Sequence, residues 1–522
     1  MRTQLFADPV GRFVHDVILE SCQRNGAKLA LFDSSCNRRF TYSEYAELVE
    51  SLARGLVSAG LNPGEVIAIF LPNSWEFAIS YHAATLAGGF ATLLNPAYRE
   101  REVRYQLESS GATFLISDAL LLENVNLGSL PCLRRVFTIR HERQGCEAFT
   151  NLLRPSSAKL PQPTQPSAQT IAALPFSSGT TGLPKGVMLS HHNLVANVYQ
   201  ILGPGASILT SSDVMLCFLP LYHIYGLTVG LTLPLTLGAT LVLMPRFDIQ
   251  KLSSLVLAEG VTMMPMVPPA INALCQAAEA GIFPKNHKVR WIKSGAAPLA
   301  PELARRATDL TGIVVVQGYG MTEASPVTHV GYVEPPEMNR PASIGQPLAL
   351  TECRVLDLND QEVPPGEPGE LVMRGPQFML GYWKDPQATA AVLHDGWYYS
   401  GDIVRTDADG FYYVLDRRKE MIKYKGFPVA PAEVESVLLE HPAVRDCGVV
   451  AKPNLEAGEI PCAFVVLRDG FTSSAALQDE LCSFVADRLA HHKQPREVHF
   501  VDSVPRTPSG KILRRDLRKT FP

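Results

Sequence analysis

Two segments of this chain repeat one order of apolar runs and turns, and this repeat restricts the fold more than any other feature. In the first segment an apolar run ends at Pro72, a glycine pair follows, and a second apolar run ends at Pro96. In the second segment the two prolines are Pro220 and Pro245, so the proline-to-proline spacings differ by one residue. Such a repeat is typical of a duplicated strand–helix–strand unit, in which parallel strands are covered by helices. We therefore predict an α/β fold with two pseudo-repeated subdomains.

Breaks in composition divide the chain further, because 522 residues exceed what one hydrophobic core holds. The segment 155–167 is rich in Pro, Ser, Thr and Gln and is typical of a connector. Short apolar runs between Gly and Pro turns begin near Ile344 and predict a small β-barrel part. The predicted N-terminal domain, 1–415, consists of α/β subdomains at about 1–165 and 166–343 and the β-barrel part at about 344–415; a hinge at 416–419 then leads to a mobile, small α+β C-terminal domain at 420–522.

The composition excludes several classes of protein. A net charge of -4 with 19% charged residues provides no basic surface for nucleic acid. The ten cysteines include no C-x-x-C pair, which is typical of free thiols in a reducing compartment, so we expect a cytoplasmic protein. Residues 224–244 carry no charged side chain, but Pro234 and three glycines divide this run into a helix and a strand at 239–244 rather than one membrane span. We expect a small-molecule substrate, and either a monomer or a homodimer is compatible with the sequence.

The residues that follow the apolar run 171–176 form a loop suited to phosphate binding. From Ser177 to Val187 the sequence is SSGTTGLPKGV. Its glycines permit turns with positive φ, its backbone N–H groups and hydroxyls can converge on a polyanion, and Lys185 adds a positive charge. The spacing differs from a Walker A loop, in which four residues separate a glycine from Gly-Lys-Ser/Thr. A surface turn of the same composition is the ordinary alternative.

This eleven-residue pattern resembles the signature loop of the adenylate-forming enzymes, the superfamily of acyl-CoA synthetases, luciferases and peptide-synthetase adenylation domains. A second segment, Gln317 to Ala324 with the sequence QGYGMTEA, is similar to the adenine and metal motif of the same superfamily. The resemblance extends from Phe40 to Lys511 and is closest to the 4-coumarate:CoA ligases. It implies an acid-thiol ligase that joins a carboxylic acid to coenzyme A through an acyl-adenylate, using ATP, Mg²⁺ and coenzyme A.

The resemblance also implies the nucleotide and metal ligands. The ring of Tyr319 would stack on adenine, and the hydroxyl of Thr322 would bind the α-phosphate. Glu323 and Thr181 would bind Mg²⁺, a hard cation that prefers oxygen ligands. The remaining implied ATP and AMP ligands are Asp402 and Arg417 at the ribose, together with Ser177, Ser178, Gly179, Thr180, Gly182, Lys185, Gly295, Ala296, Ala297, Gln317, Gly318, Gly320, Met321 and Lys511.

The implied acyl pocket surrounds the sequence PLYHIY, which closes the first strand of the second repeat at its carboxyl end, where parallel sheets bind ligands. His223 belongs to the implied catalytic set as a substrate-positioning residue, because a carboxylate is already ionised at pH 7 and adenylation requires no general base. Thr228 replaces the asparagine common in the plant enzymes, so cinnamates, benzoate-like acids and medium-chain acids all remain open. The implied pocket residues are His223, Ile224, Tyr225, Thr228, Lys293, Gly295, Gly318, Gly320, Pro326 and Val327.

The C-terminal segment contains the implied catalytic lysines. Lys511, in the sequence PRTPSGKILRR, resembles the lysine that bridges the substrate carboxylate and the α-phosphate. For the second half-reaction the resemblance implies that the small domain rotates about Lys419. Pro428 replaces the glutamine usual in the loop presented by that rotation, and proline removes both a side-chain donor and a backbone N–H. The residues implied in coenzyme A binding and thioester formation are Lys423, Lys425 and Gly426.

Three functions are compatible with these motifs. The favoured one is an ATP-dependent CoA ligase for an aryl, cinnamate-like acid, and its nearest alternative is a medium- or long-chain fatty acyl-CoA synthetase. The second is an acyl-AMP ligase that passes its acyl group to another acceptor, such as a carrier protein. The third, a non-catalytic nucleotide-binding relative, is disfavoured because the charged residues of the motifs are all present: Lys185, Glu323, Asp402, Arg417 and Lys511.

Overall fold

The computed structural model describes residues 11–128, 130–161, 168–177, 183–203, 209–425, 427–507 and 510–521. Within these residues the chain forms two nine-stranded and two five-stranded sheets. The first sheet contains, in spatial order, β20 (Gly381–Tyr382), β10 (Lys185–Ser190), β8 (Ile171–Ala173), β4 (Phe90–Leu93), β3 (Val66–Phe70), β5 (Phe114–Asp118), β6 (Arg135–Ile139) and β7 (Glu147–Ala148), with β9 (Phe176–Ser177) paired to β10.

The second nine-stranded sheet contains the second repeat. Its strands are, in spatial order, β17 (Gln346–Pro347), β16 (Val327–Val330), β15 (Val314–Gly320), β14 (Trp291–Ser294), β13 (Met263–Met266), β11 (Val214–Cys217), β12 (Thr240–Leu243), β1 (Leu29–Asp33) and β2 (Arg38–Thr41). From β15 to β1 the neighbouring strands run parallel. The helices of the two α/β units are α1 (Val14–Asn25), α2 (Tyr42–Ser58), α3 (Trp75–Leu86), α4 (Glu100–Ser110), α5 (His191–Leu202), α6 (Leu233–Leu237), α7 (Ile249–Ala258), α8 (Pro268–Glu279) and α9 (Pro301–Thr311).

Several of these helices begin at hydroxyl N-caps. Thr41 caps α2 and Ser190 caps α5, and in each case the third helical residue donates its N–H to the cap hydroxyl while its side chain accepts from the cap N–H. The hydroxyl of Ser74 accepts from the N–H of Phe77 at the start of α3. These bonds satisfy N–H groups that have no partner inside the helix. The local sequence therefore determines where each helix starts after its strand.

The predicted strand–helix–strand repeat is confirmed. β3 and β4 pair in parallel with α3 between them in the chain, and β11 and β12 pair in parallel in the same way. In the second repeat the connection is a π-helical segment, η4 (Tyr225–Thr232), followed directly by α6. The charge-free run 224–244 therefore forms helix and then strand, as predicted. None of the described helices is both long and apolar enough to cross a membrane.

The two large sheets exchange strands across the subdomain boundary predicted near residue 165. β1 and β2, from the start of the chain, pair with the second sheet through β12. β8 and β10, which follow the boundary, pair with the first sheet through β4. A subdomain boundary at 165 thus agrees with the composition of the connector, but the strand pairing crosses this boundary. Strand pairing depends on contacts between residues far apart in the chain, which composition does not reveal.

The segment predicted as β-barrel-like forms a five-stranded antiparallel sheet. It contains β18 (Glu352–Leu356), β19 (Gly369–Arg374), β22 (Trp397–Thr406), β21 (Leu393–His394) and β23 (Tyr412–Arg417), with the short helix α10 (Pro386–Ala390) between β20 and β21. β23 extends through Arg417, so the first two residues of the predicted hinge lie in a strand, and Lys419 lies in the turn that follows.

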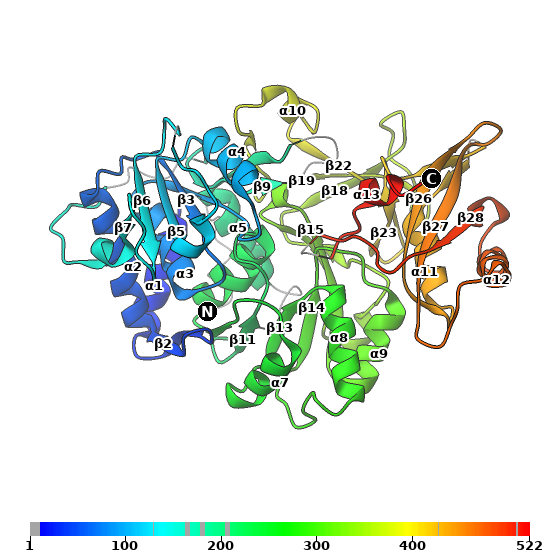
Figure 1. Ribbon diagram of the computed structural model, residues 1–522, viewed down its shortest axis with the longest axis horizontal. Helices are drawn as coiled ribbons and strands as arrows, with labels where there is room; N and C mark the ends of the chain where they lie inside the picture. The colour runs from blue at the N-terminus through cyan, green and yellow to red at the C-terminus, as the bar shows by residue number, and fades with distance from the viewer. Residues whose placement is uncertain are drawn as a thin grey trace.

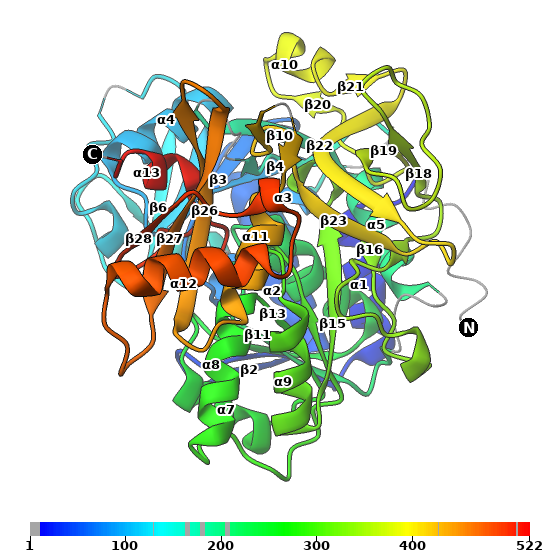
Figure 2. The same cartoon turned by 90° about the vertical axis from the view of Figure 1, so that its right-hand side faces the viewer.

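The C-terminal part has its own sheet and its own core. The sheet contains β25 (Phe427–Val429), β24 (Ile422–Tyr424), β27 (Gly458–Leu467), β26 (Val444–Asn454) and β28 (Glu497–Phe500), and its helices are α11 (Pro431–Leu439), α12 (Ala475–Ala486) and α13 (Arg514–Arg518). Val434, Val465 and Leu481 belong to a buried cluster separate from the large core of the preceding parts. In Figure 1 this part, coloured orange to red, lies next to β23 and at the opposite end from the blue and cyan first sheet. Figure 2 faces it and shows α12 across the front of the molecule.

Candidate active site

A cavity of about 3270 Å³ lies where the two large sheets, the antiparallel sheet and the C-terminal part meet. Its wall includes the carboxyl ends of β14 and β15, the edge of a parallel sheet where ligands bind. Most of the predicted site residues therefore line one cavity. These residues are Ser177, Lys185, His223, Ile224, Tyr225, Lys293, Gly295, Ala296, Gly318, Tyr319, Gly320, Met321, Thr322, Glu323, Pro326, Val327, Arg417, Lys419, Lys423 and Lys511.

Five predicted site residues are not among the lining residues: Thr228, Ala297, Gln317, Asp402 and Lys425. Gln317 accepts from the N–H of Leu299 at 3.2 Å and donates to the carbonyl of Pro341 at 2.6 Å, so its amide holds two loops to β15. Thr228 is buried inside η4, and its hydroxyl has no hydrogen-bond partner among the described residues. Six predicted residues lie outside the described residues: Ser178, Gly179, Thr180, Thr181, Gly182 and Gly426.

Asp402 lies immediately behind the cavity wall, held by Tyr319 and Arg417. Asp402 on β22 and Arg417 on β23 are direct partners in the strand register. The guanidinium Nε of Arg417 lies 2.9 Å from Oδ1 of Asp402, and the hydroxyl of Tyr319 donates to Oδ2. Burial and the adjacent carboxylate raise the pKa of Tyr319, so its hydroxyl stays protonated and acts as the donor. The three predicted adenosine ligands thus form one connected unit.

The carboxylate of Glu323 is the centre of a second cluster. Its Oε1 accepts from the Ser177 hydroxyl at 3.1 Å and from the Tyr382 hydroxyl at 2.9 Å. The ammonium of Lys185 lies 5.3 Å from the centre of the Tyr382 ring and 3.6 Å from Oδ2 of Asp385. Tyr382 and Asp385 were not predicted from the sequence, although both line the cavity. They come from β20 and the turn before α10, about 60 residues after the Tyr-Gly-Met-Thr-Glu motif.

The predicted acyl pocket is narrow at Tyr225 and the backbone of Gly295. The Tyr225 hydroxyl donates to the carbonyl of Lys293 at 2.9 Å, and a Cβ added at Gly295 would lie 3.0 Å from the Tyr225 ring. A Cβ added at Gly320 would lie 1.9 Å from the carbonyl oxygen of Pro326, so only glycine fits there. The absence of side chains at these glycines thus lets the Tyr225 ring approach the backbone of Gly295 and lets the Pro326 carbonyl approach the backbone of Gly320.

Two ionisable side chains in this pocket have shifted pKa values. Burial lowers the pKa of Lys293 to about 7, and its ammonium lies 5.3 Å from the centre of the Trp291 ring. Burial also lowers the pKa of His223 to about 4, so its imidazole is neutral at pH 7. Nδ1 of His223 accepts from the N–H of Tyr225 at 3.1 Å. The histidine thus anchors the start of η4, and its ring is uncharged next to the pocket.

Lys511 reaches this cavity from the C-terminal part. Gly510 has a φ of +86°, and a Cβ added to it would lie 3.0 Å from Pro269 of α8, so the loop contacts the second α/β unit directly. Thr507 fixes the loop, because its hydroxyl accepts from the Lys511 N–H at 3.1 Å and its N–H donates to the Lys511 carbonyl at 2.8 Å. Burial, together with the positive charge of Arg417, lowers the pKa of Lys511 to about 8. Lys511 thus shares one electrostatic environment with the Tyr319–Asp402–Arg417 unit.

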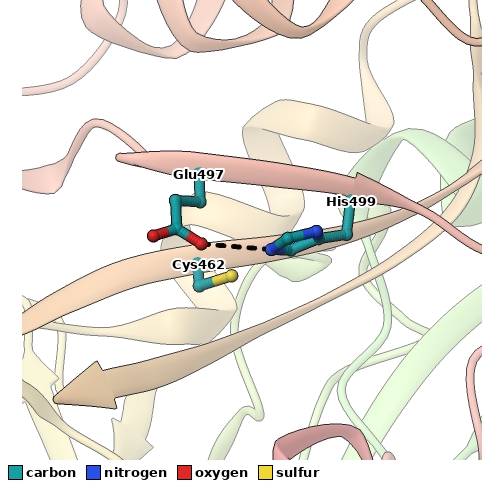
Figure 3. A group of neighbouring side chains, drawn as sticks. All are labelled: Cys462, Glu497 and His499. Carbon is teal, nitrogen blue, oxygen red and sulfur yellow. Dashed lines mark hydrogen bonds and ion pairs between the residues drawn. The ribbon is translucent and has the colours of Figure 1, made fainter. Parts of the chain in front are cut away.

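A second group of side chains with metal-ligand chemistry lies in the C-terminal sheet, away from this cavity. Cys462 on β27 and Glu497 and His499 on β28 point toward one another (Figure 3), and Nε2 of His499 lies 3.1 Å from Oε2 of Glu497. The ammonium of Lys452 contacts both Glu497 oxygens, at 2.8 and 2.7 Å. Because that ammonium already neutralises the carboxylate, we interpret the group as an ion-paired cluster of the sheet.

Comparison with known proteins identifies the family. Residues 18–383 match the family described as AMP-binding enzyme, and residues 433–511 match the AMP-binding enzyme C-terminal domain. The chain is 37% identical to 4-coumarate–CoA ligase 1 of Petroselinum crispum over 97% of its own length and 93% of the relative's. It is also 37% identical to 4-coumarate–CoA ligase 5 of Oryza sativa subsp. japonica, over 97% of this chain and 94% of that one.

Solved structures agree with these sequence matches. ATP-bound MatB from Rhodopseudomonas palustris has a TM-score of 0.88 at 28% identity, with 98% of this chain and 99% of that chain covered. An anthranilate CoA ligase in complex with anthranoyl-AMP has a TM-score of 0.87 at 27% identity, with 98% and 97% covered. A benzoate CoA ligase from Burkholderia xenovorans LB400 has a TM-score of 0.86 at 27% identity, with 97% and 100% covered. The two family models and the relatives at 37% identity together show that this chain belongs to the AMP-binding family of adenylate-forming enzymes.

Proposed function

We propose that this chain is an ATP-dependent carboxylic acid:CoA ligase whose acid is a flat aryl or cinnamate-like carboxylate. The observation that carries the proposal is that Tyr225, Gly295 and Gly320 of the predicted acyl pocket line the same cavity as Lys511. The curated relatives named 4-coumarate–CoA ligase, and the solved anthranilate and benzoate CoA ligases, support an aromatic acid.

The first half-reaction requires charge neutralisation more than proton transfer. A carboxylate oxygen attacks the α-phosphorus of ATP, the new O–P bond forms, and the bond to pyrophosphate breaks. Both reactants are anions, so the cations Lys511, Arg417 and Lys185 would attract and align them. His223, neutral and already accepting a hydrogen bond, is suited to shaping the pocket rather than to acting as a base.

In the second half-reaction the thiolate of coenzyme A attacks the acyl carbon, the thioester bond forms, and AMP leaves. We infer that the C-terminal part turns about Lys419 for this step and brings Lys423 to the acyl-adenylate. Lys419 and Lys423 both line the cavity already, so a rotation there alters the wall that the thiol approaches.

The residues present fit a divalent cation at Glu323. One oxygen of that carboxylate is held by Ser177 and Tyr382, and the carboxylate is the hard oxygen ligand that Mg²⁺ prefers. When bound, Mg²⁺ supplies neutralisation of the phosphate charge. Thr181, the other metal ligand implied by the resemblance, lies outside the described residues.

The test is AMP release from ATP and Mg²⁺ with cinnamates, benzoates and fatty acids of rising chain length, each with and without coenzyme A. The proposal predicts turnover that depends on coenzyme A and is fastest with aryl acids. Faster turnover with alkyl acids would make the chain a fatty acyl-CoA synthetase. Adenylate that forms without transfer to coenzyme A would indicate another acceptor, such as a carrier protein. Lys511→Ala is the control variant, and ATP–pyrophosphate exchange that survives this change undiminished would refute the assigned catalytic role.

A further inference from the structure

We propose that Tyr382 is a positioning residue for the adenylation step: its hydroxyl orients the Glu323 carboxylate for the divalent cation, and its ring holds the Lys185 ammonium beside the phosphates. The proposal rests on the proposed function, because it concerns binding of the metal–nucleotide complex in the same cavity. It assigns a role to a residue that the loop and adenine motifs do not contain.

The backbone fixes Tyr382 beside β10, the strand that begins at Lys185. β20 adds to the edge of the first sheet, with Tyr382 opposite Val187 in β10. On the other side, the N–H of Tyr382 donates to the Thr389 hydroxyl at 2.9 Å. Gly381 has a φ of +144°, and a Cβ added there would lie 2.8 Å from the Thr389 methyl group. Because β10 contacts this residue on one side and α10 on the other, the backbone position from which its side chain extends is fixed.

The hydroxyl of Tyr382 makes the two carboxylate oxygens of Glu323 different in their contacts. Oε1 accepts both hydrogen bonds, from Tyr382 at 2.9 Å and from Ser177 at 3.1 Å. Oε2 accepts none among the described residues, and it is not one of the buried atoms that lack a partner. Two donors on one oxygen restrict rotation of the carboxylate and leave the other oxygen available to a hard cation. Partners of this kind typically change metal affinity or activity by about 10–100-fold when removed.

The ring of Tyr382 has a separate partner. Its centre lies 5.3 Å from Nζ of Lys185, a distance within the range of cation–π contacts. Asp385, at the N-cap of α10, lies 3.6 Å from the same ammonium. The ring of Tyr382 and the carboxylate of Asp385 thus both contact the Lys185 ammonium, and the fold of residues 381–390 positions both groups.

Tyr382→Phe separates the two roles because it removes the hydroxyl and keeps the ring. In the Tyr382→Phe variant we expect the affinity for the complex of Mg²⁺ with α,β-methylene ATP, measured by calorimetry, to fall about tenfold. When EDTA removes the Mg²⁺, the affinity of the same variant for α,β-methylene ATP should stay within about twofold of the wild-type affinity. Tyr382→Leu should weaken binding under both conditions, because it also removes the ring beside Lys185. In ATP–pyrophosphate exchange, Tyr382→Phe should raise the Mg²⁺ concentration needed for half-maximal rate.

The matched control is Tyr413→Phe, which removes a tyrosine–carboxylate hydrogen bond of 2.9 Å to Asp407 outside the cavity and should leave all three measurements unchanged. Equal loss of affinity with and without Mg²⁺ in Tyr382→Phe would show a merely structural role and overturn the proposal. Unchanged affinity in both conditions would overturn it as well. Failure of the wild-type chain to activate any acid would instead count against the proposed function, since the binding measurements require no acid.

Discussion

Lys511 should take up a proton when the nucleotide binds, and the uptake can be worked out from its surroundings. Burial and the positive charge of Arg417 lower its pKa from 10.5 to about 8, while Asp402 and Glu420 oppose this shift. The displacement corresponds to roughly 3 kcal/mol of penalty on the charged ammonium. A polyphosphate beside the lysine would remove much of that penalty, because an adjacent anion favours the charged form.

The sign of the pH dependence follows from these two pKa values. At pH 9 a lysine with a pKa near 8 is only about one-tenth protonated, and one restored to about 10.5 is almost fully protonated, so binding would take up about 0.9 proton. At pH 6.5 both forms are protonated and the uptake should be near zero. Nucleotide affinity should therefore weaken as the pH rises from about 8 toward 10.

The assay is calorimetry of α,β-methylene ATP binding in two buffers of different ionisation enthalpy, at pH 6.5 and pH 9. Lys511→Gln should abolish the difference between buffers at pH 9. Lys293→Met is the matched control, because that buried lysine lies in the predicted acyl pocket and should leave the uptake intact. An uptake below about 0.2 proton at pH 9, or one that persists in Lys511→Gln, would refute the reasoning.

Two further changes distinguish the roles of individual lysines. Lys423→Ala should leave the rate of ATP–pyrophosphate exchange within about twofold of the wild-type rate and reduce the rate of coenzyme A-dependent thioester formation at least tenfold. The reason is that Lys423 is assigned to the second half-reaction alone. Equal losses of rate in both assays would contradict the assignment. Lys293→Met should raise the melting temperature at pH 7 by a few degrees. Because burial lowers the pKa of Lys293 to about 7, the wild-type chain gains stability as the pH rises from 7 toward 10.5. The difference in melting temperature between variant and wild type should therefore shrink over that range, and a difference that stays constant would argue that burial does not destabilise the Lys293 ammonium.

Local sequence patterns could predict the repeat and the two nucleotide motifs. Prolines and glycines mark the ends of β3, β4, β11 and β12, and these ends are set by short-range geometry. Ser177 and Glu323 were both predicted as ligands, and the structure brings them within 3.1 Å because Ser177 ends β9 and Glu323 follows β15, and both strands end at the cavity. Motif spacing is informative here because the strands ending at this cavity are held in register by their sheets.

Other parts of the site depend on contacts that no local pattern reveals. Tyr382 belongs to a two-residue strand, too short to show periodicity, and it reaches Glu323 only because β20 adds to the edge of the first sheet. The resemblance to the 4-coumarate:CoA ligases implied that Thr228 lines the acyl pocket. Thr228 is buried in the π-helical segment η4 and is not among the residues that line the cavity, and its sequence position does not reveal which side chains of η4 face inward. The exchange of strands between the two large sheets near residue 165 was not predicted either, because the paired strands lie far apart in the chain.

The pairing of β1 with β12 has a consequence for synthesis of the chain. Leu31 lies opposite Leu241 in the second sheet, so the N-terminal hairpin cannot complete its pairing until about 200 further residues have been translated. At typical elongation rates this delay lasts roughly 10–40 s, during which the apolar edge of β1 is open to wrong partners. The nascent protein should therefore depend on chaperone protection until the second sheet emerges from the ribosome.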